Sequence, residues 1–331
     1  MTTNPAPARY FPFRSGQYKV AAGLYALGQD FGNGQRDKQI FQIDHDWPDY
    51  REAKLAARAE SLAKYVCHDG FEAPLKREVN LWFIRQLAKE HPAQFTLHDD
   101  ARQLVLRCNL SHETLRFSVD GELIAAETGG LGAAIEPAYA DAWDALACQI
   151  QEDLAVVHAP SDAEEKLVAL HLCFPNHWAA QDKIGKPFLN IHRPVADFEQ
   201  IARTAPALLK NMITRGPFVR FAWGLATDSR LNHHPRPPPD FPADAAWHGR
   251  RFDPDQPQLY VRVERQTLTG LPQVDACVFT IRTYFLDVAT LDSNDRLALR
   301  DAIVSMSDAV LRYKGIASYQ DAVTAWLGMR H

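Results

Sequence analysis

Two segments of the chain contain residues with the chemistry to bind a cofactor. In the first, Cys173–Val195 (CFPNHWAAQDKIGKPFLNIHRPV), His192 follows an apolar run. An imidazole on an apolar wall is what a haem iron requires of an axial ligand, although a lone histidine beside apolar residues is also common in protein cores. His171, which alternates on a predicted strand, and His177, in the PNHW turn, compete for the same role.

The second segment, Tyr260–Tyr284 (YVRVERQTLTGLPQVDACVFTIRTY), has the alternation of a β-hairpin. In its first strand Arg265 points the same way as Val261 and Val263, and the intervening residues point the opposite way. We interpret its polar positions as one array in the middle of a sheet, formed by Arg262, Glu264, Gln266, Thr280, Arg282 and Tyr284. Such an array is either a solvated face with cross-strand ion pairs or a pocket for a carboxylate, and the propionates of haem would satisfy the second interpretation.

Several other chemistries have no motif in this sequence. The glycine-rich stretches 28–34 and 129–132 lack the spacing of a dinucleotide fingerprint or a P-loop, so we expect that the chain does not bind NAD(P)H by itself. No HExxH or GxSxG sequence is present. The adjacent pair His233-His234 lies beside prolines, which predicts an exposed loop.

The bulk composition is that of an ordinary globular protein. Of 331 residues, 46% are hydrophobic and 23% charged, with a net charge of -5 and a pI near 6.2, which argues against a nucleic-acid partner. No apolar run approaches the roughly 18 residues of a membrane span. The five cysteines form no CxxC pair and resemble reduced thiols, so we expect a cytoplasmic protein.

The elements that must position these residues are helices flanking clusters of strands. Period-two patterns predict three short strands within 95–119, then strands at 167–174, 218–225, 258–268 and 276–285, the last two paired antiparallel. Helical spacing predicts helices from Asp46 (with Leu55, Ala59, Leu62 and Val66 inward) and at 77–90, 138–157, 197–214 and 293–313. This order favours an α+β fold with an antiparallel sheet flanked by helices, in one domain spanning 1–331.

The same two segments carry a resemblance to a known family. The pattern FPxxWxxxxKxGxxxxxIHxPV is present between Phe174 and Val195, and RVERQTLxxLP followed by VFTIRTY is present between Arg262 and Tyr284. On these motifs the sequence resembles the alpha subunit of haem-dependent oxidative N-demethylase. The resemblance implies a PAS-like core that binds haem b (heme b). It also implies O2-dependent demethylation of a small secondary amine such as dimethylamine, with electrons supplied by NADPH through a separate flavin and iron–sulfur reductase component.

The resemblance and the strand alternation together give each residue a hypothetical role. His192 is assigned as the haem iron ligand because the matched motif ends on it, and Cys173 is the alternative, since a thiolate ligates the haem iron of P450 enzymes. Arg262, Arg265 and Arg282 are assigned as propionate or pocket cations. Glu264 is a candidate for pairing with a cationic amine, and Tyr284 for donating a hydrogen bond.

Two other classes of function stay open at this point. A PAS-like core is compatible with a haem-binding sensor or gas-binding module without turnover. A haem-free ligand-binding protein that kept the fold is also compatible, because fold does not fix function.

Overall fold

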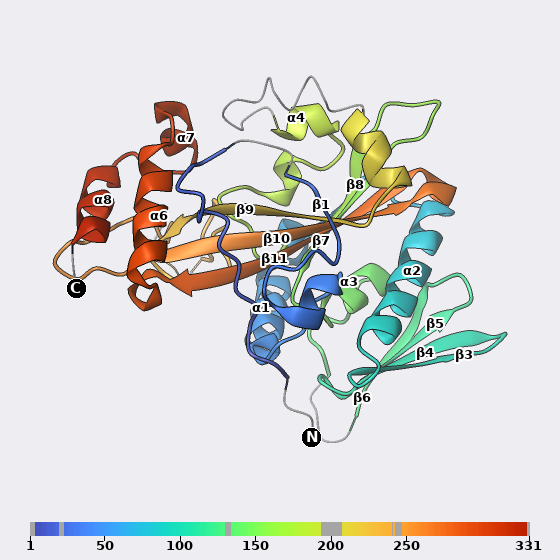
Figure 1. Cartoon of the computed structure of the whole chain (residues 1–331). Coiled ribbons are helices and arrows are strands. Elements are labelled where there is room, and N and C mark those ends of the chain that lie inside the picture. The colour runs from blue at the N-terminus through green and yellow to red at the C-terminus, as the bar shows by residue number, and fades with distance from the viewer. Residues whose placement is uncertain are drawn as a thin grey trace.

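The computed structural model describes residues 4–19, 23–129, 134–192, 207–239, 241 and 247–329. Its centre is a seven-stranded antiparallel sheet in the order β1-β9-β10-β11-β7-β8-β2 (Figure 1). Its strands are β1 (Tyr25–Ala26), β2 (Val66–His68), β7 (Asp153–His158), β8 (Lys166–His171), β9 (Phe218–Ala226), β10 (Tyr260–Leu271) and β11 (Ala276–Asp287). A second sheet is the meander β3 (Phe95–Asp99), β4 (Gln103–Cys108), β5 (Glu113–Ser118) and β6 (Leu123–Thr128).

Helices cover both faces and one end of the large sheet. The α-helices are α1 (Trp47–Tyr65), α2 (Leu75–Glu90), α3 (Ala142–Ala147), α4 (Phe188–His192), α6 (Ser293–Val304), α7 (Asp308–Tyr313) and α8 (Gln320–Gly328), and residues 207–214 are also helical. Short 3-10 turns are η1 (Gly34–Lys38), η2 (Ala180–Asp182), η3 (Pro272–Val274) and η4 (Val288–Thr290). Within the described parts of the chain, no helix is both long and apolar enough to cross a membrane.

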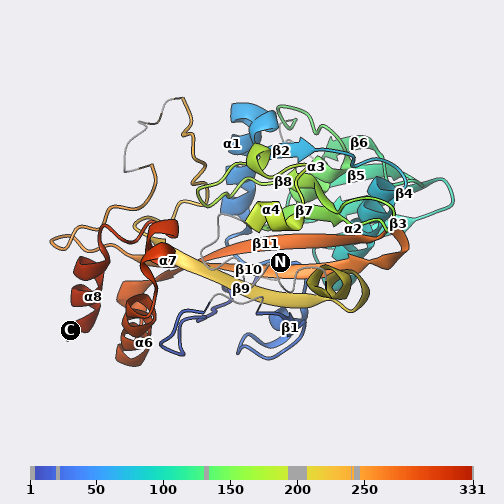
Figure 2. The same cartoon turned by 90° about the horizontal axis from the view of Figure 1, so that it is seen from above.

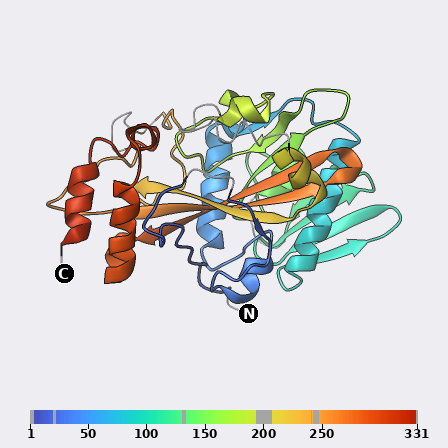
Figure 3. The same ribbon diagram turned by 45° about the horizontal axis from the view of Figure 1, so that its top comes forward.

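The two faces of the large sheet have different coverings, which Figures 1 and 3 show from two directions. Helix α4 and residues 207–214 lie over one face, the α4 face. Helices α1, α2 and α3 lie over the other, the α1 face, and the four-stranded sheet packs beside them. Seen from above, α6, α7 and α8 lie at one end of the long strands, and the four-stranded sheet lies toward the other end (Figure 2).

The antiparallel α+β arrangement predicted from the sequence is confirmed at this level. The β10–β11 hairpin pairs continuously from Tyr260↔Asp287 to Leu271↔Ala276. The three short strands predicted within 95–119 are β3 to β5, and Gly121, with φ of 75°, forms the turn into β6. The helix predicted at 197–214 lies mostly outside the described residues, and its final part, 207–214, is helical.

The long helix predicted over 138–157 is wrong. Only Ala142–Ala147 is helical, and the strand β7 begins at Asp153. Every residue from 142 to 157 is buried. A fully buried segment gives no alternation between inside and outside, so apolar spacing cannot separate a helix from a strand there.

Helix α1 forms where it was predicted but buries the opposite face. Leu55, Ala59, Leu62 and Val66 were expected inward, and all four are exposed or half-buried. The buried face carries Arg51, Lys54 and Arg58 instead. Arg51 binds Glu113 at 2.7 Å, Arg58 forms two hydrogen bonds of 2.8 Å with Asp144, and Lys54 donates to the carbonyl oxygens of Ala147 and Glu152. These buried acceptors lie far away in the sequence, so the helix's own pattern cannot reveal them.

The helix predicted at 293–313 is also interrupted. It ends at Val304, and α7 starts again with the Ser307 hydroxyl accepting a hydrogen bond from the Val310 amide. Serine at such a position satisfies an amide that has no partner within the helix, and so marks a new helix start. Helix α8 was not predicted.

Candidate functional site

The centre of the α4 face is formed by β9, β10 and β11. In antiparallel strands, residues directly opposite each other point to the same face. The register places three rows of side chains across this face: Arg220, Gln266 and Ile281; Ala222, Glu264 and Thr283; Gly224, Arg262 and Phe285. A side-chain carbon added at Gly224 would meet no atom of a described residue within 4 Å, so the described part of the chain leaves the space above this position open.

The single polar array predicted from the hairpin is wrong. Thr280, Arg282 and Tyr284 were expected beside Arg262 and Glu264. The register instead pairs Thr280 with Thr267, Arg282 with Arg265 and Tyr284 with Val263, and all of these point to the α1 face. Alternation within each strand was predicted correctly, but which sides of the two strands coincide depends on a register that the turn sequence did not reveal.

On the α1 face, the three predicted site residues are buried in a polar network. Arg282 binds Asp44 at 2.7 Å, and its guanidinium lies 3.8 Å from the centre of the Tyr50 ring. Arg265 donates to the carbonyl oxygens of Gln39 and Ile40 at 2.6 and 3.2 Å, and the Tyr284 hydroxyl donates to the side-chain oxygen of Gln42. These contacts tie β10 and β11 to α1 and to the segment that leads into it.

Glu152 lies in the same network and gives a prediction about pH. Burial raises the pKa of this carboxyl to about 7. The pKa of this carboxyl is higher in the folded protein than in the unfolded chain. The contribution of Glu152 to stability is therefore full below about pH 4 and is lost as pH rises through about 7. Glu152→Gln removes this pH dependence. Its effect on the free energy of unfolding, measured against the wild type, should therefore be more stabilising at pH 8 than at pH 5 by about 1–3 kcal/mol. Urea unfolding at both pH values measures it, and an equal effect at the two pH values would contradict the assignment.

His192 ends helix α4 above the α4 face. Its Nδ1–H donates to the carbonyl oxygen of Phe188 at 2.7 Å, and the two rings lie 4.2 Å apart. Burial first, and then the nearby cations Lys183 and Arg220, together lower the pKa of His192 to about 4. The imidazole is therefore neutral at pH 7, and its Nε2 lone pair has no hydrogen-bond partner among the described residues. A carbonyl holding the other ring nitrogen is the usual support for a metal-binding histidine.

The rival ligands His171 and Cys173 lie on the α1 face. His171 is fully buried, and its Nε2–H donates to Asp144 at 3.1 Å. Burial, then the nearby Asp153 carboxylate, raises the pKa of the Cys173 thiol well above its usual value. A thiol in this environment is poorly suited to act as a thiolate ligand.

His177 belongs to a group of three histidines beside Arg262. Its ring stacks on His233 with centroids 5.5 Å apart, and His248 lies 5.9 Å away. The expectation that His233-His234 is an exposed pair is wrong, because the two residues are 1% and 2% exposed. His233 donates from Nε2 to Asp228 at 2.9 Å and accepts at Nδ1 from Arg262 at 3.3 Å. Adjacent prolines marked the loop correctly but carried no information about what the loop packs against.

Basic side chains that the sequence interpretation did not select surround the α4 face. They are Lys183, Arg220, Arg250 and Lys314, and none makes an ion pair with a described residue. Burial lowers the pKa values of all four, to about 8 for each lysine. The Nε atoms of Arg220 and Arg250 are buried and have no hydrogen-bond partner in the part of the chain that the structure describes. Desolvated cations without counter-charges are costly, so this face suits an anionic ligand.

Glu264 is the carboxylate at the centre of these cations. It accepts a hydrogen bond from Gln266 at 3.0 Å and lies 3.8 Å from the Nε of Arg262. Arg262 is fully buried and donates to the carbonyl oxygens of Phe174 and Leu231 at 2.7 and 3.0 Å. Both terminal nitrogens of its guanidinium are thus anchored, with His233 and Thr283 as further acceptors, while its buried Nε has no hydrogen-bond partner among the described residues.

These features fit haem. An axial ligand needs a neutral imidazole with a free nitrogen, which His192 has, and two propionates need cations without partners, which the face supplies. A family model described as "Haem-dependent oxidative N-demethylase, alpha subunit-like" matches residues 33–324. The chain belongs to this family. The family's name points to an oxidoreductase that depends on haem, and the matched region contains His192, Glu264 and all the cations of the α4 face.

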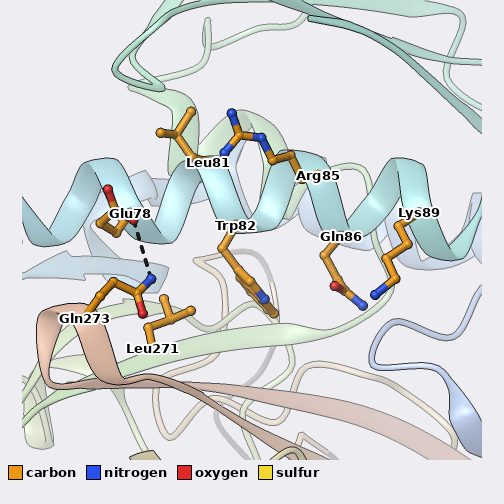
Figure 4. Close-up of a pocket in the computed structure, with 8 residues that line it drawn as sticks. All are labelled: Glu78, Leu81, Trp82, Arg85, Gln86, Lys89, Leu271 and Gln273. Carbon is orange, nitrogen blue, oxygen red and sulfur yellow. Dashed lines mark hydrogen bonds between the residues drawn. The ribbon is translucent and has the colours of Figure 1, made fainter.

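The demethylase-family chain has two further features that resemble sites. Asp144, Cys148 and His171 bring possible metal-binding atoms within 4.8 Å of one another, but Arg58 already neutralises the Asp144 carboxylate. A surface pocket of about 270 Å³ lies between α2 and the β10–β11 turn, where Trp82 points toward the hairpin and Glu78 accepts from Gln273 (Figure 4). No histidine or cysteine lines this pocket, so it offers no ligand to a haem iron.

Proposed function

We propose that the chain binds one haem b over the α4 face and catalyses the oxidative N-demethylation of a small secondary amine. The observation that carries this proposal is a neutral, carbonyl-supported imidazole, His192, above a face of unpaired cations in a chain of this family. The five strands β7 to β11 lie side by side in the order β9-β10-β11-β7-β8, which is 3-4-5-1-2 when they are counted along the chain. The helical segment between β8 and β9 lies on one face of these strands. That order supports a PAS-like core within a single domain.

In this proposal His192 ligates the iron through Nε2, and Arg262 binds a propionate. Bound haem supplies the activation of O2. The chain's own residues keep the imidazole neutral and anchor the Arg262 guanidinium. We assign Arg265, Arg282 and Tyr284 a structural role, because they point away from His192 into a buried polar network.

The overall reaction consumes O2, two electrons and two protons, and releases amine, formaldehyde and water. Hydroxylation of a methyl group on nitrogen gives a carbinolamine. Its C–N bond then breaks, and the hydroxyl proton passes to the nitrogen. We propose that the electrons come from NADPH through a separate flavin and iron–sulfur reductase and that the protein acts in the cytoplasm.

Glu264 is the proposed partner of the substrate ammonium group, because it is the one carboxylate in the middle rows of the face. Glu264→Gln keeps the hydrogen bond to Gln266 but removes the charge. We expect the KM for the amine to rise about tenfold or more, which corresponds to roughly 1.4 kcal/mol or more of lost binding. Steady-state formaldehyde release with a reductase measures the change, with Glu78→Gln on α2 as the matched control. An unchanged KM would remove Glu264 from substrate binding.

Turnover separates this proposal from a haem-binding sensor. Haem-loaded protein is mixed with NADPH, a flavin and iron–sulfur reductase and dimethylamine, and O2 and formaldehyde are measured. We expect formaldehyde in proportion to the O2 consumed. Stoichiometric haem and CO binding, with no amine-dependent O2 consumption for any secondary amine tested, would favour a gas-binding module.

A further inference from the structure

The charge on the α4 face exceeds what one haem can balance. Four cations there have no ion pair among the described residues, namely Lys183, Arg220, Arg250 and Lys314, and Arg262 adds a fifth beside Glu264. A haem supplies two propionates. The face would therefore keep an excess of positive charge after haem has bound, and a simple ammonium substrate would increase that excess.

The unpaired arginines lie toward opposite ends of the face. Arg220 is opposite Gln266, whereas Arg262 is opposite Gly224, four residues further along β9. Four residues of strand span roughly 13 Å. Arg250 belongs to the Arg262 end, because Arg250 and Arg262 both lower the pKa of His177, and Arg220 belongs to the His192 end.

The two propionates of a haem leave the ring from the same edge. They can neutralise the cations at one end of the face, and the other end keeps a half-buried arginine whose Nε is buried without a hydrogen-bond partner among the described residues. The guanidinium of such an arginine is a two-pronged donor that matches a carboxylate. Glu264 lies between the two ends, where it can face an ammonium group at the same time.

We propose, as an extension that rests on the proposed function, that the substrate is a secondary amine that also carries a carboxylate, such as an N-methylated amino acid. The carboxylate binds whichever of Arg220 and Arg250 the haem leaves free, and the ammonium group faces Glu264. Such a zwitterion adds no net charge to the face. The reaction is the same oxidative demethylation, with an amino acid as the amine product.

The test compares ligands that differ in the carboxylate alone. Haem-loaded protein is titrated with N-methylglycine, with its methyl ester and with dimethylamine, and binding is followed by the Soret band and by calorimetry. We expect N-methylglycine to bind at least about tenfold more tightly than the ester or dimethylamine, because a site that bonds a polar group discriminates against analogues lacking it. Equal affinity for acid and ester would overturn the proposal.

Two variants, Arg220→Gln and Arg250→Gln, then locate the carboxylate. We expect one variant to lose haem, and the other to keep haem but bind N-methylglycine no better than the ester. Lys89→Gln, which removes an exposed charge on α2, is the control and should change neither. If both arginine variants lose haem, or both keep haem and the preference for the acid, no arginine is left for the substrate and the proposal fails.

Haem binding and the preference for a carboxylate-bearing substrate can be contradicted independently. A wild-type protein that takes up no haem contradicts the proposed function. Calorimetry with N-methylglycine and its ester on that same haem-free protein then tests the carboxylate preference alone.

Discussion

Replacing His192 with alanine should leave a folded protein that no longer retains haem. His192 is half-buried at the end of a short helix, and the hydrogen bond from its Nδ1 joins it to Phe188 of the same helix, so its loss costs little stability. Its Nε2 is the proposed iron ligand. Losing even a partner that supports a metal ligand costs about 10–100-fold in affinity, so loss of the ligand itself should exceed that range.

Haem titration of the purified variant, followed at the Soret band, measures this affinity. His98→Ala is the matched control, because the His98 side chain is 76% exposed on β3, away from the α4 face. Added imidazole should restore part of the haem binding to His192→Ala by occupying the vacated space. A variant with undiminished affinity and an unchanged spectrum would move the ligand to another residue, with His177 the nearest alternative on this face.

Replacing Arg282 with methionine should destabilise the protein strongly without acting through the haem site. Arg282 is fully buried, and the change leaves the Asp44 carboxylate buried without its cation. Removing one partner of a buried ion pair typically costs about 3–5 kcal/mol of unfolding free energy. Urea denaturation of the haem-free protein measures the loss.

The double variant Asp44→Asn with Arg282→Met distinguishes a structural pair from a cofactor cation. With both charges removed, much of the lost stability should return, because the cost lies in the uncompensated charge. The double variant should also bind haem as the wild type does. A single variant that keeps its stability but loses haem would show that Arg282 binds the cofactor after all.

The parts of the fold that follow from local sequence were predictable. The β10–β11 hairpin, the meander and α2 each have their own periodicity and turn residues. The strand β7 and the inward face of α1 were not predictable in this way. Residues 142–157 are all buried, so β7 shows no alternation of exposed and buried positions. The basic face of α1 points inward because its arginines form ion pairs with Glu113 and Asp144, which are distant in sequence.

The residues of the candidate site also divide into those that sequence motifs could predict and those that only the tertiary fold brings together. His192, Arg262 and Glu264 lie in the two motif-bearing segments, and the structure places all three about the α4 face. Arg250 and Lys314 come from segments without a recognisable motif, and only the tertiary fold brings them to this face. Lys183 lies within the first motif, but it stands beside Asp182 and close to Lys186, so its local sequence did not set it apart.

The most direct test of the proposed haem site is the absorption spectrum of the wild-type protein expressed with a haem precursor, recorded oxidised, reduced, and reduced with carbon monoxide. We predict a Soret band corresponding to one haem per chain and a carbon monoxide complex of the histidine-ligated type. A carbon monoxide complex of the thiolate type would contradict His192 as the ligand. The absence of any Soret band would contradict the haem site itself.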